Sequence, residues 1–233
     1  RAYQDLYDNY NDLLIYFIKF WVEVAKRFSD CSNCLGYELI NEPWAGDVFE
    51  NPSLLLPGVS DRVNLEPMYN KLAYYIRQID ENHPIFFESV TWDDTGVGFS
   101  QTPGNIPNKS ILSYHGYFPP NLTPNVMFKT RIRDMKRLGI GGFLTEFSYG
   151  SGNTGDGKDL KKALNLLDYA DKYVQSWAVW EYKQFFPITG VNTGFFTNNS
   201  KLTNTYYTLS RTYATHVQGR IQKMRFYNDT GNF

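Results

Sequence analysis

The stretch Gly36-Tyr37-Glu38-Leu39-Ile40-Asn41-Glu42-Pro43 joins a β-rich apolar run to an abrupt polar end. We predict a strand over residues 35–42, because Pro43 has no backbone N–H for a sheet and therefore ends the pairing. Glu42 then stands at the C-terminal end of the strand, where a (β/α)8 barrel carries its catalytic groups. The alternative interpretation is a solvated glutamate at a capped strand end.

A second strand of the same kind also runs into a glutamate. Gly142-Phe143-Leu144-Thr145-Glu146-Phe147 is again β-rich, and Glu146 follows Glu42 by 104 residues (146 − 42). That separation fits strands four and seven of an eight-stranded barrel. A retaining glycosidase needs two carboxyl groups roughly 5–5.5 Å apart. We therefore expect both carboxyl groups to meet at the rim of one barrel.

Predicted strands and helices alternate along the chain. Apolar runs rich in β-formers predict strands over residues 35–42, 84–90, 111–115, 140–147 and 176–182. Helical periodicity predicts helices over residues 13–24, 65–82, 125–138, 160–173 and 204–213. This alternation favours a parallel sheet with crossover helices. Because five strands cannot close an eight-stranded barrel, we predict an α/β fold that is a partial (β/α)8 TIM barrel, strands four to eight. A doubly wound three-layer sheet is the alternative fold.

Composition excludes some classes of protein and favours carbohydrate binding. The 23 basic and 24 acidic residues leave a net charge of −1, which gives no electrostatic footprint for nucleic acid or an anionic membrane. No apolar run reaches the length of a membrane span. Aromatic residues make up 17% of the chain, including 18 Tyr and 5 Trp. Their faces suit sugar rings, although many of these residues must belong to the core.

Two further sequence features bear on the cellular compartment. Cys31-Ser32-Asn33-Cys34 lacks the second pair that a zinc ribbon needs, and we interpret it as a local disulfide or two idle thiols without a catalytic role. Asn-x-Ser/Thr sequons begin at Asn108, Asn121, Asn198 and Asn228. They lean mildly towards a secreted or lysosomal protein, which is the localisation we predict. The chain begins at an arginine that we expect to lie inside a further helix, so a signal peptide would lie outside the chain.

The ends of other predicted strands carry groups suited to a sugar. His115 and Tyr117 are two residues apart, so an extended backbone would point both to the same side. A phenol there could hydrogen-bond a nucleophile and an imidazole could orient a sugar hydroxyl, whereas the plainer interpretation of His115 is a satisfied rim histidine. Asn41 could bind the sugar 2-hydroxyl, and Trp180 could be a platform for the sugar.

The residues alone do not select Glu146 from the other glutamates on predicted strands, which are Glu38, Glu88 and Glu181. The combination of motifs does. Asn41-Glu42-Pro43, His115-x-Tyr117, Thr145-Glu146-Phe147 and Trp180, in this order, resemble glycoside hydrolase family 5. Residues 36–47, 51–58, 143–147 and 211–214 resemble its endoglycoceramidase branch.

The resemblance implies roles and a reaction. Glu42 matches the acid/base and Glu146 the nucleophile, while Asn41, Tyr117 and Trp180 match residues that line the subsite for the glucose next to ceramide. His115 matches the rim histidine of the family. The implied reaction hydrolyses the β-glycosidic bond between this glucose and ceramide in a glycosphingolipid, and it releases the intact oligosaccharide. The two carboxyl groups carry both roles, so we expect no metal and no cofactor.

The resemblance also implies an organisation of the chain. Residues 1–215 would be the C-terminal part of the catalytic barrel, without its first three strands, and residues 216–233 the start of a truncated β-sandwich. We expect a monomer whose membrane contact is made only through the lipid substrate. Trp44 and the run Leu54-Leu55-Leu56 would suit a ceramide chain, or would simply pack in the loop.

Two other functions remain open from the sequence. A family relative could cleave another β-glucoside, in a polysaccharide or a steryl glucoside. An inactive glycolipid-binding protein could keep Trp180 and the rim loops without turnover. Replacing Glu146 with glutamine separates enzyme from binder, since binding should survive while turnover should vanish.

Overall fold

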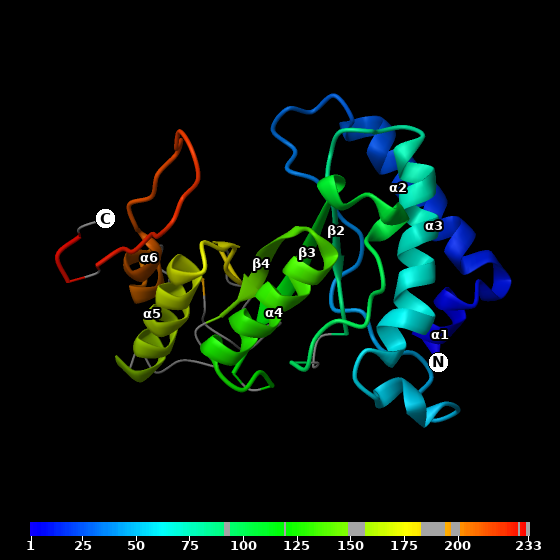
Figure 1. The fold of residues 1–233 in the computed structure, drawn as a ribbon, viewed down its shortest axis with the longest axis horizontal. Coiled ribbons are helices and arrows are strands. Elements are labelled where there is room, and N and C mark those ends of the chain that lie inside the picture. The colour runs from blue at the N-terminus through cyan, green and yellow to red at the C-terminus, as the bar shows by residue number, and fades with distance from the viewer. Residues whose placement is uncertain are drawn as a thin grey trace. The chain divides into compact units, whose positions relative to one another are not determined.

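The computed structural model describes residues 1–90, 94–118, 120–148, 157–182, 194–196, 201–227 and 229–231. Its helices and strands alternate as predicted (Figure 1). Within these ranges the α-helices are α1 (Ala2–Tyr7), α2 (Leu13–Phe28), α3 (Glu66–Arg77), α4 (Pro124–Leu138), α5 (Gly157–Lys172) and α6 (Asn204–Leu209). The strands in the same ranges are β1 (Tyr37–Glu38), β2 (Ile85–Glu88), β3 (Ser110–Gly116), β4 (Gly141–Phe147) and β5 (Ser176–Trp177). Shorter helical turns cover Tyr10–Asp12, Pro52–Leu55, Asp61–Leu65, Pro103–Asn105 and Pro107–Lys109.

The strands follow the sheet in sequence order, β1-β2-β3-β4-β5. β1 pairs with β2 and β2 with β3, both in parallel, as the alternation of strands and helices predicts. Successive parallel neighbours joined through helices are what a barrel requires, and the strands in the described residues show no doubly wound reversal of order. None of the helices in the described ranges is long and apolar enough to cross a membrane.

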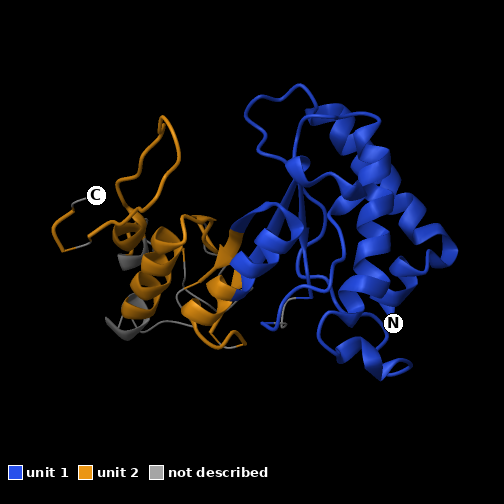
Figure 2. Ribbon diagram, viewed as in Figure 1, with its two compact units in different colours: residues 1–114, 130–143 blue, residues 115–129, 144–233 orange. Residues whose placement is uncertain are grey.

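The chain forms two compact units (Figure 2). Unit 1 comprises residues 1–114 and 130–143, and unit 2 comprises residues 115–129 and 144–233. β3 and β4 begin in unit 1 and end in unit 2, so that their C-terminal residues belong to unit 2. This division falls inside the predicted barrel segment, whereas the predicted boundary between residues 215 and 216 stays a prediction.

In unit 1, α2 packs against α3, and Tyr69 of α3 contacts Phe87 of β2 edge to face. Both helices bury one side and leave the other polar or exposed, as their periodicity predicts. The buried side chains of α2 and α3 are Leu14, Ile18, Ala25, Met68, Tyr69, Leu72, Ala73 and Ile76. Every residue of β2 is buried, which is typical of a strand in a parallel sheet covered on its faces.

In unit 2, α5 buries its apolar side chains near the ends of β3 and β4. Gly116, at the end of β3, lies where an added Cβ would come within 3.2–3.4 Å of Leu144, Leu166 and Met127. Glycine therefore lets the helices pack closely against the strand end. The buried apolar residues of this unit include Met127, Phe128, Leu144, Phe147, Leu166, Leu167 and Ala170.

Several predicted elements are longer than the observed ones. The predicted helix 65–82 ends at Arg77, and the predicted strand 84–90 is regular over Ile85–Glu88. Three further elements are shorter than predicted for a local reason. The predicted strand 35–42 pairs regularly only over Tyr37–Glu38, because the carbonyl of Leu39 accepts from Trp21 Nε1 and the Glu42 N–H donates to a side chain. Beyond β5, the backbone N–H groups of Ala178 and Trp180 donate to the carbonyl oxygens of Leu144 and Phe147, respectively. The two donors are two residues apart and the two acceptors are three residues apart, so the pairing is irregular here.

The last predicted helix, 204–213, ends at Leu209. The Ser210 hydroxyl donates to the carbonyl of Tyr206, which occupies a helical acceptor. Arg211 then forms a buried ion pair with Asp171, with Nη2 2.6 Å from Oδ2. The backbone N–H of Phe226 donates to the same carboxylate. This carboxylate therefore fixes the chain after α6 against the end of α5.

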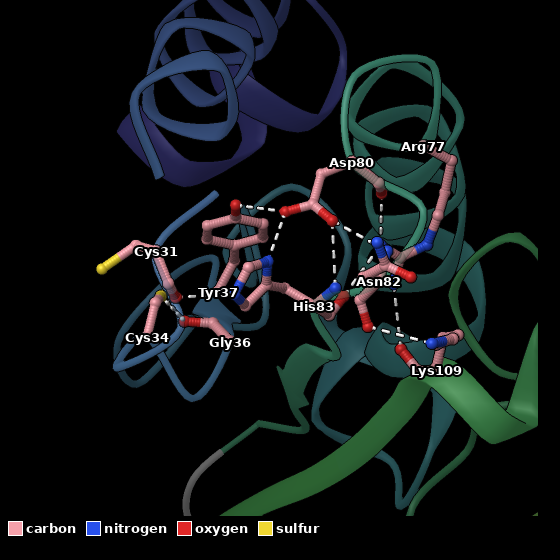
Figure 3. A network of polar contacts seen from close by, with 9 residues as sticks. All are labelled: Cys31, Cys34, Gly36, Tyr37, Arg77, Asp80, Asn82, His83 and Lys109. Carbon is pink, nitrogen blue, oxygen red and sulfur yellow. Dashed lines mark hydrogen bonds and ion pairs between the residues drawn. The ribbon is translucent and has the colours of Figure 1, made fainter. Parts of the chain in front are cut away.

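A buried carboxylate also organises the start of β1 and β2 (Figure 3). Asp80 accepts from the Tyr37 hydroxyl at 2.5 Å and lies 2.6 Å from His83 Nδ1, and its other oxygen accepts from the backbone N–H groups of Asn82 and His83. Arg77 donates to the carbonyl oxygens of Asp80 and His83. The network therefore ties the C-terminal end of α3 to the first residue of β1 and to the turn before β2.

The two cysteines lie beside this network as free thiols. The Cys31 carbonyl lies 3.2 Å from His83 Nε2, and Cys34 Sγ lies 3.6 Å from the carbonyl oxygen of Gly36 (Figure 3). Of the two sequence interpretations, the structure has idle thiols and no disulfide. The backbone at Cys31 contributes to the fold, because its carbonyl oxygen is the partner of His83 Nε2 while Asp80 is the partner of Nδ1.

Candidate active site

The predicted site residues all fall in described parts of the chain, at the C-terminal ends of strands. Asn41 and Glu42 follow β1 in unit 1. The other four belong to unit 2 and follow or end β3, β4 and β5, as the sequence predicts; they are His115, Tyr117, Glu146 and Trp180. Parallel strands present their carboxyl ends at one edge, which is where ligands bind in such sheets.

The backbone of Glu42 has an unusual conformation, and its N–H is bonded to a side chain. Its φ is +43°, a left-handed conformation that is uncommon for a residue with a side chain. Its N–H donates to Glu88 Oε2 at 2.9 Å. The neighbouring residue Asn41 is exposed, while the Glu42 side chain is half-buried. The chain thus leaves β1 at this turn with the amide and the carboxyl group both accessible.

Glu146 contacts two of the other predicted site residues. The hydroxyl of Tyr117 donates to Glu146 Oε1, and His115 Nδ1 lies 3.9 Å from the same oxygen. The rings of His115 and Tyr117 face each other edge to face, with centroids 6.5 Å apart. His115 is buried and the Glu146 side chain is 17% exposed. The expectation that both residues, two apart, would point to one side is confirmed.

Trp180 projects from the end of β5. Its side chain is 45% exposed, and its backbone N–H donates to the carbonyl of Phe147 at 2.8 Å. This bond places Trp180 one residue beyond Glu146 along the neighbouring strand. Trp177 is half-buried and packs edge to face on Phe147 with centroids 5.7 Å apart. The more exposed of the two tryptophan rings is therefore that of Trp180.

The other strand glutamates have different surroundings. Glu38 Oε1 accepts from the Ser113 hydroxyl at 2.5 Å, and Glu88 Oε2 accepts the Glu42 N–H. Glu181 is buried, and neither of its carboxylate oxygens has a hydrogen-bond partner among the described residues. Of the four, Glu146 is the carboxylate in contact with a phenol and an imidazole, a combination that the sequence could not single out.

Sequence reasoning missed two supporting residues. Asn121 is buried; its Oδ1 accepts the Tyr117 N–H at 3.0 Å, and its own N–H donates to the Tyr117 carbonyl. Glu88 supports Glu42 in the same way. The Asn-x-Thr pattern at Asn121 drew attention to glycosylation, although a turn-forming asparagine four residues after Tyr117 was the useful signal.

The loop after β1 carries an exposed apolar patch. Trp44, Phe49, Leu55 and Leu56 are 46%, 93%, 52% and 58% exposed, respectively. Leu54 is buried, so the packing interpretation holds for this residue, whereas contact of the exposed residues with a ceramide chain stays a prediction. The Tyr7 hydroxyl donates to the Trp44 carbonyl and fixes the base of the loop to α1. Exposed apolar side chains mark a contact with lipid or protein where they form one contiguous patch.

Comparison with known proteins identifies the family of the chain. The family Cellulase (glycosyl hydrolase family 5) matches residues 1–186. An endoglycoceramidase of Hydra vulgaris is 43% identical over 235 residues, covering 97% of this chain and 43% of the relative. An endoglycoceramidase of Cyanea nozakii is 46% identical over 187 residues, covering 79% of this chain and 36% of the relative. The chain thus spans less than half the length of these relatives.

Solved structures support the fold. The lactosyl-enzyme intermediate of endo-glycoceramidase II from Rhodococcus sp. superposes with a TM-score of 0.74 at 18% identity, covering 89% of this chain and 48% of that one. An endogalactoceramidase matches with a TM-score of 0.58 at 20% identity, over 79% of this chain and 40% of that one. These likenesses identify the sheet and its helices as part of a TIM barrel, and the match over residues 1–186 shows that the chain belongs to glycosyl hydrolase family 5.

Proposed function

We propose that the natural protein containing this chain is a retaining endo-β-glycosidase that hydrolyses the glucose–ceramide bond of glycosphingolipids. The observation that carries the proposal is the contact of Glu146 with Tyr117 and His115 at the ends of two strands. It occurs in a family 5 chain that is 43% identical to an endoglycoceramidase over nearly its whole length. Oligosaccharide and ceramide would leave as intact products.

In the proposed mechanism Glu146 attacks the anomeric carbon of the glucose. Glu42 donates its proton to the glycosidic oxygen as the bond to ceramide breaks, and a covalent glycosyl-enzyme forms. Glu42 then takes a proton from water, which attacks the same carbon and releases Glu146. The Tyr117 hydroxyl holds one oxygen of Glu146 so that the other is presented to the sugar. Neither step requires a metal or an organic cofactor.

The remaining predicted residues would bind substrate. Asn41 is exposed beside Glu42 and can donate to the sugar 2-hydroxyl, an interaction that strengthens in the transition state. The open face of Trp180 can stack on the glucose ring. Trp44, Leu55 and Leu56 offer apolar surface for a ceramide chain. This last feature favours a lipid aglycone over a polysaccharide, whose cleft would be lined with aromatic residues on both sides.

The test is product analysis with lactosylceramide and the full-length natural protein. Intact lactose and ceramide, abolished by Glu146→Gln and retained in the surface variant Glu81→Gln, would support the proposal. Galactose alone would indicate an exo-acting relative and overturn it. Glycolipid binding without turnover in the unsubstituted protein would indicate a binding protein. We further propose a monomeric protein that is secreted or lysosomal, which sedimentation and cell fractionation would test.

A further inference from the structure

Glu88 is a buried carboxylate that the proposed mechanism does not use. It is the last residue of β2 and is only 2% exposed. A carboxylate is rarely buried in a parallel strand unless its oxygens are bonded, because its charge loses the solvation of water. One partner is the backbone N–H of Glu42, 2.9 Å from Glu88 Oε2. Glu88 thus joins the end of β2 to the proposed acid/base residue.

The backbone around Glu88 is fixed on both sides by a second buried residue. The Tyr69 hydroxyl donates to the Glu88 carbonyl at 2.9 Å and accepts from the Glu88 N–H at 3.1 Å. Tyr69 itself is 1% exposed, and its ring packs edge to face on Phe87 and Phe99. The carboxylate of Glu88 therefore projects from a rigid part of the core.

The Glu42 backbone needs such a partner. A φ of +43° is costly for a residue with a Cβ and persists only where the surroundings impose it. Since Glu42 follows the regular part of β1, its N–H is not paired in the sheet and donates to Glu88 instead. A charged acceptor makes this hydrogen bond stronger than one between neutral groups.

We propose that Glu88 is a positioning residue for acid catalysis: its carboxylate holds the Glu42 backbone in the turn that aims the Glu42 carboxyl group at the leaving oxygen. This inference rests on the proposed function, since it concerns the residue that protonates the glycosidic oxygen. It assigns Glu88 no contact with substrate.

Two substitutions separate positioning from packing in the full-length natural protein. Glu88→Gln keeps an oxygen that can accept the Glu42 N–H, whereas Glu88→Leu has similar bulk and no acceptor. Two substrates then report on protonation. The alkoxide of ceramide must be protonated as it leaves, whereas 2,4-dinitrophenolate, released from an aryl β-lactoside, is stable without a proton. An acid that is out of place should therefore matter only for the first.

For Glu88→Leu we expect kcat/KM on lactosylceramide to fall about 100-fold, within the range of general acid catalysis, and kcat/KM on the aryl lactoside to fall less than about 5-fold. Glu88→Gln should stay within about 5-fold of the unsubstituted protein on both substrates. Added azide should yield a glycosyl azide with Glu88→Leu, because this anion attacks the glycosyl-enzyme without help from a base. Glu81→Leu, at an exposed position after α3, is the control.

Other results would overturn the inference. An equal loss on both substrates, together with a lower melting temperature, would make Glu88 a packing residue only. If Glu88→Leu had the same ratio of the two kcat/KM values as the unsubstituted protein, Glu88 would also have no positioning role. The proposed function would stand in both cases. If the unsubstituted protein turned over neither substrate, the proposed function would fall and this inference with it.

Discussion

The hydroxyl of Tyr117 donates a hydrogen bond to Oε1 of Glu146, so the residue after β3 and the penultimate residue of β4 act as one group. A carboxylate with one oxygen held in this way has a fixed orientation, and the proposed mechanism assigns the attack to its other oxygen. The relationship leads to a direct prediction about turnover.

Tyr117→Phe should lower kcat about 10- to 100-fold on lactosylceramide, since a hydrogen bond to a charged group contributes about 1.5–3 kcal/mol. KM should change little if the phenol acts on Glu146 and not on the sugar. Steady-state kinetics of the full-length natural protein measure both. The control is Tyr173→Phe, which removes a phenol whose partner is Asn125, beyond the other end of β5. An equal effect of the two substitutions would contradict the prediction.

Asn121 should act on the same group through the Tyr117 backbone. Asn121→Ala removes the acceptor of the Tyr117 N–H, and we expect kcat to fall about 3- to 10-fold, the effect of one neutral hydrogen bond of about 1 kcal/mol. Residues that share one network are not additive. The double variant with Tyr117→Phe should therefore lose no more activity than Tyr117→Phe alone. Additive losses would show that Asn121 acts independently of Tyr117.

Much of this arrangement follows from local sequence. The presence of a strand before Pro43 could be predicted, because proline interrupts sheet pairing, although β1 ends at Glu38 and not at residue 42. The shared direction of His115 and Tyr117 followed from the two-residue period of a strand. The order of the strands followed from their alternation with helices.

The supporting contacts could not be predicted from the sequence. Glu88 lies 46 residues from Glu42, and no local pattern links a strand-end glutamate to a backbone N–H in another strand. The same holds for Ser113 and Glu38, which are 75 residues apart. Such contacts depend on the register between β1, β2 and β3, which only the packed helices determine. The extents of β1 and β5 were overestimated for the same reason.

Burial distinguishes two of the predicted glycosylation sequons. Asn108 is exposed in a helical turn, whereas Asn121 is 7% exposed and its side chain accepts the Tyr117 N–H. Asn198 and Asn228 lie outside the described residues. If the protein enters the secretory pathway, peptide mapping after treatment with a peptide-N-glycosidase should find a glycan at Asn108 and none at Asn121. A glycan at Asn121 would contradict the buried position of its amide.

Asp80 should make the fold sensitive to acid. Burial alone would raise the pKa of this carboxyl group, but hydrogen bonds from Tyr37, from the backbone of His83 and Asn82 and from the His83 side chain lower it from 3.8 to about 2. Since the folded-state pKa lies below the unfolded one, the stabilisation is present above about pH 4 and is lost as the pH falls towards 2. A shift of this size corresponds to about 2 kcal/mol.

Asp80→Asn should therefore lower the free energy of unfolding by about 2 kcal/mol at pH 7, and it should flatten the loss of stability between pH 4 and pH 2. Urea unfolding of the full-length natural protein at several pH values measures both effects. Asp30→Asn, at an exposed position after α2, should change neither. A pH dependence that stayed steep in Asp80→Asn would assign the acid sensitivity to other carboxylates, because asparagine keeps acceptors for the backbone N–H groups but has no proton to gain in this range.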